Sequence, residues 1–215
     1  MRQELRGFEV ECCRGLVKGC PHSLKRTPHL VEEIYSIASA SGWERRFEGE
    51  GGIPRHHQML HVGISACPNA CARVQIKDIG ILVRCEVEVL PSRCTGCGEC
   101  TSMCREGALE LVEEGIHLHG ERCLGCGDCT RVCEEGALEM GERYFEVMVG
   151  GRLGRHPRFA QTIGRAHSEE EIIYFFSRVV ELLDRHRDMP SARALFSLYP
   201  LESFRTFLKG EEIGS

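Results

Sequence analysis

A cysteine-rich segment in the middle of the chain occurs twice, and this repeat limits the possible folds more than any other feature of the sequence. Each copy has the spacing C-x2-C-x2-C-x3-C and continues into the tetrapeptide Gly-Ala-Leu-Glu. The cysteines are Cys94, Cys97, Cys100 and Cys104 in the first copy, and Cys123, Cys126, Cys129 and Cys133 in the second. Because an internal duplication produces two similar units, we predict a small module with approximate two-fold symmetry.

The spacing within each copy is that of bacterial two-cluster ferredoxins, in which the fourth cysteine of one copy binds the cluster of the other. This pattern predicts two [4Fe-4S] clusters, which exchange their fourth ligands between the copies. One would be held by Cys94, Cys97, Cys100 and Cys133, and the other by Cys123, Cys126, Cys129 and Cys104. Structural zinc is the alternative, but zinc sites usually use two separated ligand pairs, whereas three close cysteines with a remote fourth suit a cubane.

Composition supports metal ligation over disulfides. The chain has 14 cysteines among 215 residues, and the repeated C-x2-C spacing is a ligand pattern. No apolar run reaches the length of a membrane span, and the N-terminus does not resemble a secretory signal, so we expect a cytoplasmic protein without membrane contact. Its cysteines would then be in a reducing compartment, which disfavours disulfides. A formal charge of -5 argues against nucleic acid as the main partner.

A second group of cysteines lies near the ends of predicted strands. Cys67-Pro68-Asn69-Ala70-Cys71 forms a tight turn between two apolar runs. An earlier loop runs from Cys12 and Cys13 to Cys20, also after a short strand. Two such loops could close on one further cluster, with Cys67, Cys71, Cys20 and either Cys12 or Cys13 as ligands. Cys85 lies within a strand-like run and is interpreted as a packed thiol.

The remaining pattern mixes helices and strands, which predicts an α+β class. We expect a helix from Thr27-Pro28 to Gly42, a surface connection from Trp43 to Pro54, and a capped amphipathic helix beginning at Ser168. A last helical segment is expected from about Ser191 to Lys209. Strands are expected at 59–64, at 79–89 as a strand or hairpin, and at 144–149. The module is therefore interpreted as an insertion, with one domain formed by residues 1–90 and 142–215 and the inserted ferredoxin domain by residues 91–141.

The two cysteine loops resemble the siroheme and [4Fe-4S] domain of sulfite and nitrite reductases, where a C-x5-C loop and a C-P-N-x-C loop bind one cluster. The resemblance extends to Ile76-Lys77-Asp78-Ile79-Gly80 and to Val149-Gly150-Gly151-Arg152. An inserted ferredoxin module makes the chain similar to the dissimilatory and anaerobic branch. The first loop is longer here, C-x6-C from Cys13 or C-x7-C from Cys12, so the residues leave open which thiol is the ligand.

The resemblance implies three [4Fe-4S] clusters and a siroheme in this protein. Cys71 would bridge the third cluster to the siroheme iron, with Asn69 beside the macrocycle. Siroheme carries eight carboxylates, so the resemblance also implies basic residues at the site, and Arg14 and Lys77 would take part in catalysis as well. The candidate basic residues are Arg14, Lys18, Arg73, Lys77, Arg152, Arg155 and Arg158.

The function implied is reduction of sulfite, nitrite or a related small oxyanion, with electrons from a low-potential donor entering through the ferredoxin module. Relatives carry a further ferredoxin-like half before the first cysteine loop, whereas Cys13 is preceded here by twelve residues. We therefore expect a second copy or a partner subunit to complete the oxyanion site. The alternative is an electron-transfer or assembly subunit whose siroheme pocket is empty or holds another tetrapyrrole. A zinc-stabilised interaction protein is the third possibility.

Overall fold

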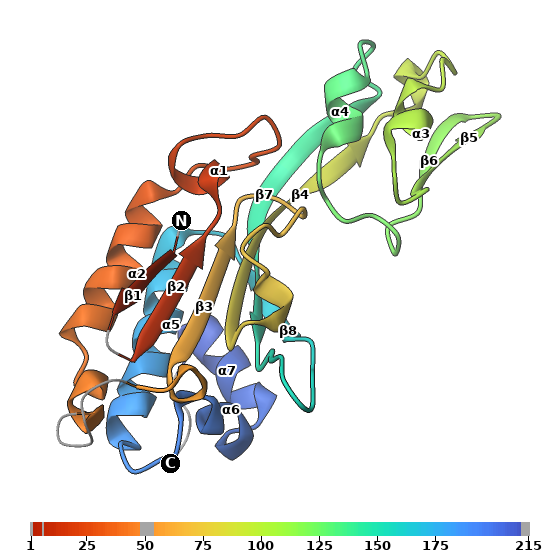
Figure 1. Ribbon diagram of the computed structural model, residues 1–215. Coiled ribbons are helices and arrows are strands. Elements are labelled where there is room, and N and C mark those ends of the chain that lie inside the picture. Colours follow the sequence, from red (N-terminus) through yellow and green to blue (C-terminus); the bar gives the residue numbers. More distant parts are fainter. Residues whose placement is uncertain (1, 6, 48–53, 212–215) are drawn as a thin grey trace.

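The computed structural model describes residues 2–5, 7–47 and 54–211, which form one mixed sheet, a layer of helices and a cysteine-rich lobe (Figure 1). The sheet has the strand order β1-β2-β3-β4-β7-β8. Its strands are β1 (Arg2–Leu5), β2 (Phe8–Cys12), β3 (Leu60–Ser65), β4 (Ile79–Val89), β7 (Leu138–Val149) and β8 (Gln161–Ala166). Strands β2, β3 and β4 are parallel, while β1, β7 and β8 join antiparallel. The expected class of mixed α and β structure is confirmed.

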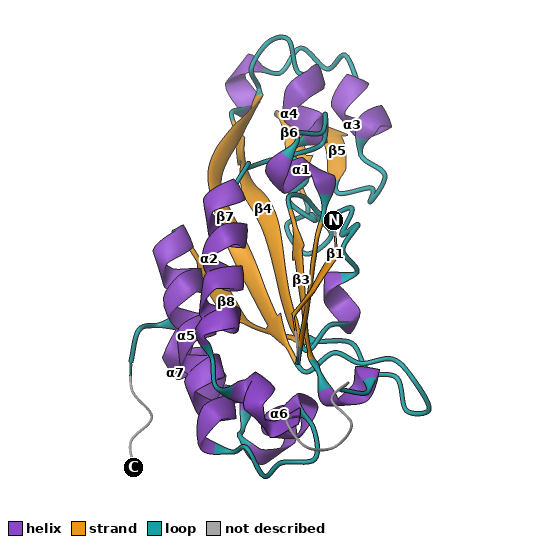
Figure 2. Ribbon diagram, turned by 60° about the vertical axis from the view of Figure 1, so that its left-hand side comes forward, coloured by secondary structure: helices purple, strands orange, loops and turns teal. Residues whose placement is uncertain are grey.

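Helices cover one face of this sheet (Figure 2). They are α2 (Pro28–Ala40), α5 (Glu169–Arg185) and α7 (Leu201–Leu208). Strand β2 shows how the faces are divided, because Phe8, Val10 and Cys12 are buried in the core against the helices. Successive side chains of a strand point to opposite faces, so Glu9 and Glu11 of β2 point away from the helices. This second face carries the charged residues described below.

Two predicted helix starts are confirmed, and a contact joins them. The backbone N–H of Glu171 donates to the Ser168 hydroxyl at 3.2 Å, which caps α5. Helix α2 begins at Pro28, directly after Thr27. Glu169, in the first turn of α5, accepts from the backbone N–H of Leu30 at 3.1 Å. A carboxylate at the start of one helix therefore also satisfies an N–H at the start of the other.

One prediction for a connecting segment is wrong, in the part of that segment that the structure describes; residues 48–53 of it lie outside the described ranges. Trp43 was expected in a surface connection, but it is fully buried and packs edge-to-face on Phe47, within the 3-10 helix η1 (Trp43–Phe47). Burying its large apolar ring is favourable in free energy, and this outweighs the charged composition of the neighbouring sequence, on which the prediction was based. The expected C-terminal helical segment is present, but it is interrupted. It divides at Pro200 into η5 (Ala192–Ala194) with α6 (Leu195–Leu198) and then α7, because proline cannot continue a helix from the preceding turn.

The duplicated cysteines lie in a lobe at the far end of β4 and β7, beyond the rest of the sheet (Figure 1). The lobe contains η4 (Pro91–Arg93), α3 (Glu99–Met103), a hairpin of β5 (Leu109–Val112) and β6 (Gly115–Leu118), and α4 (Asp128–Val132). It has a small apolar cluster of its own, made by Cys100, Leu109, Ile116, Cys129 and Leu138. β4 is one continuous strand, and its partner β7 starts at Leu138, earlier than the sequence pattern indicated.

The loop after β7 is in close backbone contact with the segment that precedes β4, and Gly151 of that loop makes the contact possible. A Cβ added at Gly151 would lie 2.5 Å from the Lys77 carbonyl oxygen and 2.8 Å from the Gln75 carbonyl oxygen. We expect Gly151→Ala to lower the free energy of unfolding by about 1–3 kcal/mol, because backbone atoms cannot move aside cheaply. Denaturant unfolding measures this loss.

The matched control is Gly120→Ala, at a glycine of the lobe where an added Cβ would meet nothing within 4 Å. Its effect on the free energy of unfolding should stay within about 0.5 kcal/mol. Equal effects of the two substitutions would contradict the close contact at Gly151.

Candidate functional site

The central loop, Cys67 to Cys71, follows β3 and is held by short local hydrogen bonds. The Ala70 N–H donates to the Cys67 carbonyl at 3.1 Å, and the Ala72 N–H donates to the buried Ser65 hydroxyl at 3.1 Å. Ala70 has a φ of 49°, a conformation that residues other than glycine rarely adopt. Cys67 is buried and Cys71 is exposed. The loop therefore presents one thiol inward and one outward.

The structure places Cys13, and not Cys12, against this loop. Cys12 is buried among core residues, as the last inward position of β2. Cys13 donates its backbone N–H to the Ile64 carbonyl at 3.0 Å, and its sulfur accepts from the Ala66 N–H at 3.2 Å. The sequence of β2 could have distinguished the two cysteines, because Phe8, Val10 and Cys12 occupy alternate positions of one apolar face, which places Cys12 in the core.

Cys13, Cys20, Cys67 and Cys71 come together at the end of β3. Burial raises the pKa of the Cys67 thiol, the Asn69 N–H lowers it, and negative charge on the other three sulfurs raises it further. Cys67 is thus within electrostatic reach of all three. The Leu24 N–H donates to the Ala66 carbonyl at 3.0 Å, which ties the end of the first loop to the central one.

In the lobe, each of two cavities is lined by cysteines from both repeats. A cavity of about 560 Å³ is lined by Cys94, Cys97, Cys100 and Cys133. Burial raises the pKa of Cys100, and the charges of Cys133 and Cys94 raise it further, which agrees with this grouping. The Ala137 N–H donates to the Cys133 sulfur at 3.2 Å.

The second cavity of the lobe, about 190 Å³, is lined by Cys104, Cys123, Cys126 and Cys129 among others. Burial raises the pKa of Cys129 to about 12, with further contributions from the other three sulfurs. The Ala108 N–H donates to the Cys104 sulfur at 3.3 Å, which matches the contact made by Cys133 in the other repeat. Each cavity therefore takes its fourth thiol from the opposite repeat.

The second cavity also adjoins the central loop. Pro68 and Asn69 contribute to its lining, together with the cysteines of the second site. A smaller cleft is lined by His22, Cys67, Pro68, Asn69, Cys126 and Asp128. The three cysteine sets consequently form a series, in which the set with Cys126 lies between the set with Cys133 and the set with Cys67.

Cys85 belongs to none of the three sets. It is buried in β4, and its thiol donates to the Gly125 carbonyl at 3.4 Å. Burial raises its pKa to about 11, with smaller contributions from Cys126 and Cys123. It packs as a neutral side chain beneath the second repeat.

Several basic candidates are paired with carboxylates or backbone. Lys77 is buried, and its Nζ lies 2.9 Å from both Glu9 and Glu11. Arg73 also contacts Glu11, at 2.9 Å. The remaining candidates lie at the short helix α1 (Arg14–Val17) or on the loop after β7. Arg152 donates to the His156 carbonyl at 2.8 Å and Arg158 to the Gly150 carbonyl at 3.0 Å, while Arg14, Lys18 and Arg155 are exposed.

Charged residues that sequence reasoning missed hold this face together. Asp78 is fully buried and accepts from the His61 backbone N–H at 2.9 Å and from the Arg193 guanidinium at 3.1 Å. Burial raises the pKa of Asp78, and the charges of Arg193 and His61 lower it. Glu9 is also buried. The alternation of acidic with apolar residues in β2 could have indicated that Glu9 and Glu11 lie together on this face. Nothing in the sequence around Arg193 indicated that it lies there too.

A family model described as the nitrite and sulphite reductase 4Fe-4S domain matches residues 17–193, which include Cys20 and the other candidate cysteines that follow it. The chain belongs to this family. Membership explains why the two loops converge, since a domain of this description binds a four-iron cluster. The expected relationship to sulfite and nitrite reductases is confirmed.

Individual relatives of this reductase family are longer than the chain. The coenzyme F420-dependent sulfite reductase of Methanocaldococcus jannaschii is 37% identical over 148 residues, which are 69% of this chain and 24% of that protein. A subunit of the anaerobic sulfite reductase of Salmonella typhimurium is 36% identical over 56 residues, 26% of this chain and 16% of that polypeptide. The chain thus aligns with a quarter or less of either relative.

A solved structure supports the fold independently. Dissimilatory sulfite reductase I superposes with a TM-score of 0.60 at 13% sequence identity, and the match covers 97% of this chain and 53% of that one. At this identity the likeness concerns the fold alone. Among the described residues, no helix combines the length and the apolar character that crossing a membrane requires.

Proposed function

We propose that this chain carries the redox centres of a siroheme-dependent reductase of sulfite, or of nitrite or a related small oxyanion. One observation carries the proposal: three sets of four thiols lie in series, and the last set includes the exposed Cys71 of the Cys-Pro-Asn loop. Four thiols around each site are the donor set of a [4Fe-4S] cluster. Three such clusters would account for every cysteine except Cys12 and Cys85.

At the last site, we propose Cys13, Cys20, Cys67 and Cys71 as the cluster ligands. Because Cys71 is exposed, its sulfur is accessible to a group outside the loop, and the exposed Asn69 would lie beside that group. Siroheme, when bound there, supplies an iron centre that transfers electrons to the oxyanion. Arg14, the first residue of the short helix α1 (Arg14–Val17), and Arg155, on the loop after β7, are exposed cations and suit the carboxylates of that group.

Basic residues that already have partners have a different proposed role. Lys77 and Arg73 are already compensated by Glu9 and Glu11, so they would act through orientation and local charge. Arg152 would hold the loop after β7 in place through its bond to the His156 carbonyl. These pairings favour the second candidate function, an electron-transfer or assembly subunit, because they leave fewer cations to balance a carboxylate-rich macrocycle.

Electrons would enter through the inserted ferredoxin domain, for which we propose residues 91–141. The set with Cys133 would receive them first and the set with Cys126 second, since only the latter adjoins the central loop. The remainder of the chain, residues 1–90 and 142–215, would be the siroheme and [4Fe-4S] domain. A low-potential donor would supply the electrons, and a second copy or a partner subunit would complete the oxyanion site.

The test is the protein purified anaerobically from a host that makes siroheme. We expect about twelve cluster irons per chain, from three four-iron clusters, together with tetrapyrrole absorption bands. Reduced methyl viologen should be oxidised in the presence of sulfite or nitrite, and the oxyanion should be consumed. Clusters that accept electrons without bound tetrapyrrole or oxyanion consumption would support the electron-transfer role and contradict the reductase.

A further inference from the structure

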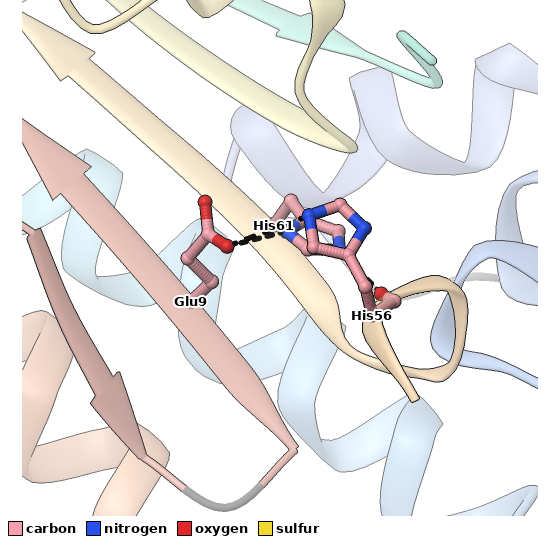
Figure 3. Close-up of side chains that lie close together, drawn as sticks. All are labelled: Glu9, His56 and His61. Carbon is pink, nitrogen blue, oxygen red and sulfur yellow. Dashed lines mark hydrogen bonds and ion pairs between the residues drawn. The ribbon is translucent and has the colours of Figure 1, made fainter. Parts of the chain in front are cut away.

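The charged face holds a cavity of about 400 Å³ that none of the cysteine sets reaches. Its wall includes Glu9 of β2, His56 of the 3-10 helix η2 (His56–Gln58), and His61 of β3. Figure 3 shows the two imidazole rings side by side, facing the same carboxylate. Glu9 and His61 are buried, whereas His56 is exposed.

The separations between these groups match those of ligands around one ion. The Glu9 Oε2 atom lies 3.4 Å from His61 Nδ1 and 3.6 Å from His56 Nε2. One ligand atom of each residue lies within 4.8 Å of the others. Tetrahedral bonds of about 2.0–2.1 Å place neighbouring ligand atoms about 3.3 Å apart. The observed separations are longer than a strong charge-assisted hydrogen bond, which is about 2.7–2.9 Å.

The hydrogen bond made by His61 Nε2 determines whether the Nδ1 atom of the same ring can act as a metal ligand. His61 Nε2 lies 2.7 Å from the His56 carbonyl oxygen. A carbonyl oxygen only accepts, so Nε2 carries the proton, and Nδ1 of the neutral ring offers a lone pair. That lone pair faces a carboxylate oxygen, which is also an acceptor. A cation between them removes the conflict, and metal-binding histidines usually donate their other ring N–H in this way.

The two imidazole rings converge on this carboxylate. The His56 and His61 rings lie with centroids 4.1 Å apart and planes tilted by 31°, which is close enough for one ion to contact both. Lys77 occupies the other oxygen of the carboxylate, since its Nζ lies 2.9 Å from Glu9 Oε1. The Glu9 Oε2 atom, on the other side of the carboxylate, faces the two histidines.

We propose that Glu9, His56 and His61 form a binding site for a divalent first-row transition metal ion of the Zn²⁺ class. Two imidazoles and one carboxylate are a common set of three protein ligands for zinc, with a fourth position left to water. The adjoining cavity gives that position access to solvent. None of its ligands belongs to a cysteine set, and the site meets the proposed reductase site only through the ion pair of Glu9 with Lys77.

The experiment uses cluster-loaded protein, purified anaerobically, washed with chelator and then supplied with Zn²⁺. X-ray absorption at the zinc edge reports the ligands while iron is present. Nitrogen and oxygen ligands at about 2.0–2.2 Å support the site, whereas sulfur at about 2.3 Å would show binding to thiols and overturn it. The iron content, measured before and after, must stay unchanged.

A matched pair of variants tests the ligands by titration calorimetry. His56→Gln removes an exposed ligand, so the variant should fold normally, and we expect its Zn²⁺ affinity to fall at least 10-fold. His57→Gln is the control, because His57 is exposed on the same cavity but outside the trio, and its affinity should match the parent protein. Equal affinities in all three proteins, or no binding to the parent, would overturn the proposal and leave a histidine-carboxylate ion pair.

Discussion

Replacing Cys71 with serine should abolish oxyanion reduction and leave the irons of the ferredoxin module in place. Cys71 is the exposed sulfur of the central loop, and we propose it as the link between a cluster and the catalytic iron. Even outer partners of metal ligands typically contribute 10–100-fold to activity, so loss of this ligand should cost at least about 100-fold. The viologen-linked assay measures turnover, and iron analysis measures what the module retains.

The control for Cys71 uses the neighbouring pair, Cys12 and Cys13. Cys12→Ala removes a core thiol and should keep all irons and full turnover, at a cost in stability of about 1 kcal/mol. Cys13→Ala should lose the irons of the central site. Normal turnover in Cys71→Ser would exclude a bridging role, and iron loss in Cys12→Ala without loss in Cys13→Ala would reverse the ligand assignment.

Replacing Cys133 with alanine should remove about four of about twelve irons, and they should come from the site built mainly by the first repeat. Cys133 lines the cavity that Cys94, Cys97 and Cys100 also line. Without its remote thiol, that cluster has three ligands and is lost or degraded. Electrons should then fail to enter by this route, so donor-driven reduction of the remaining clusters should slow. Iron and acid-labile sulfide analysis measures the loss.

Two double variants separate this exchange of ligands from binding within each repeat. Cys100→Ala combined with Cys133→Ala damages one shared site, so it should lose no more iron than Cys133→Ala alone. Cys129→Ala combined with Cys133→Ala damages two sites and should lose about eight irons. Binding within each repeat predicts the reverse ranking of the two double variants.

Local signals in the sequence identified much of the fold. The cap at Ser168 and the proline start at Pro28 depend on neighbouring residues only, and both helices form where they were predicted. The expected separation of Cys85 from the cysteine sets also agrees with its burial in β4. These features follow from spacing and side-chain chemistry within a few residues.

Features that depend on distant contacts could not be predicted in this way. β7 starts at Leu138 because it pairs with Val89 of β4, which lies on the other side of the duplicated segment. Trp43 is buried because Gly7 leaves space for its ring and Phe47 packs against it. The histidine site needed the parallel register of β2 and β3, which places Glu9 opposite His61. No periodicity in the sequence reports such a pairing.

The long pairing of β4 with β7 has a consequence for the proposed transfer of electrons. These two strands run without a break from the main sheet into the cysteine-rich lobe, with an irregularity in register only between Cys85 and Val87. At that point the Cys85 N–H donates to the Gly125 carbonyl at 3.0 Å, which fastens the second repeat to the ribbon. If the lobe transfers electrons as we propose, it would do so from a fixed position and not as a mobile carrier. Transfer to the central loop would take place at constant separation, without waiting for a diffusive encounter.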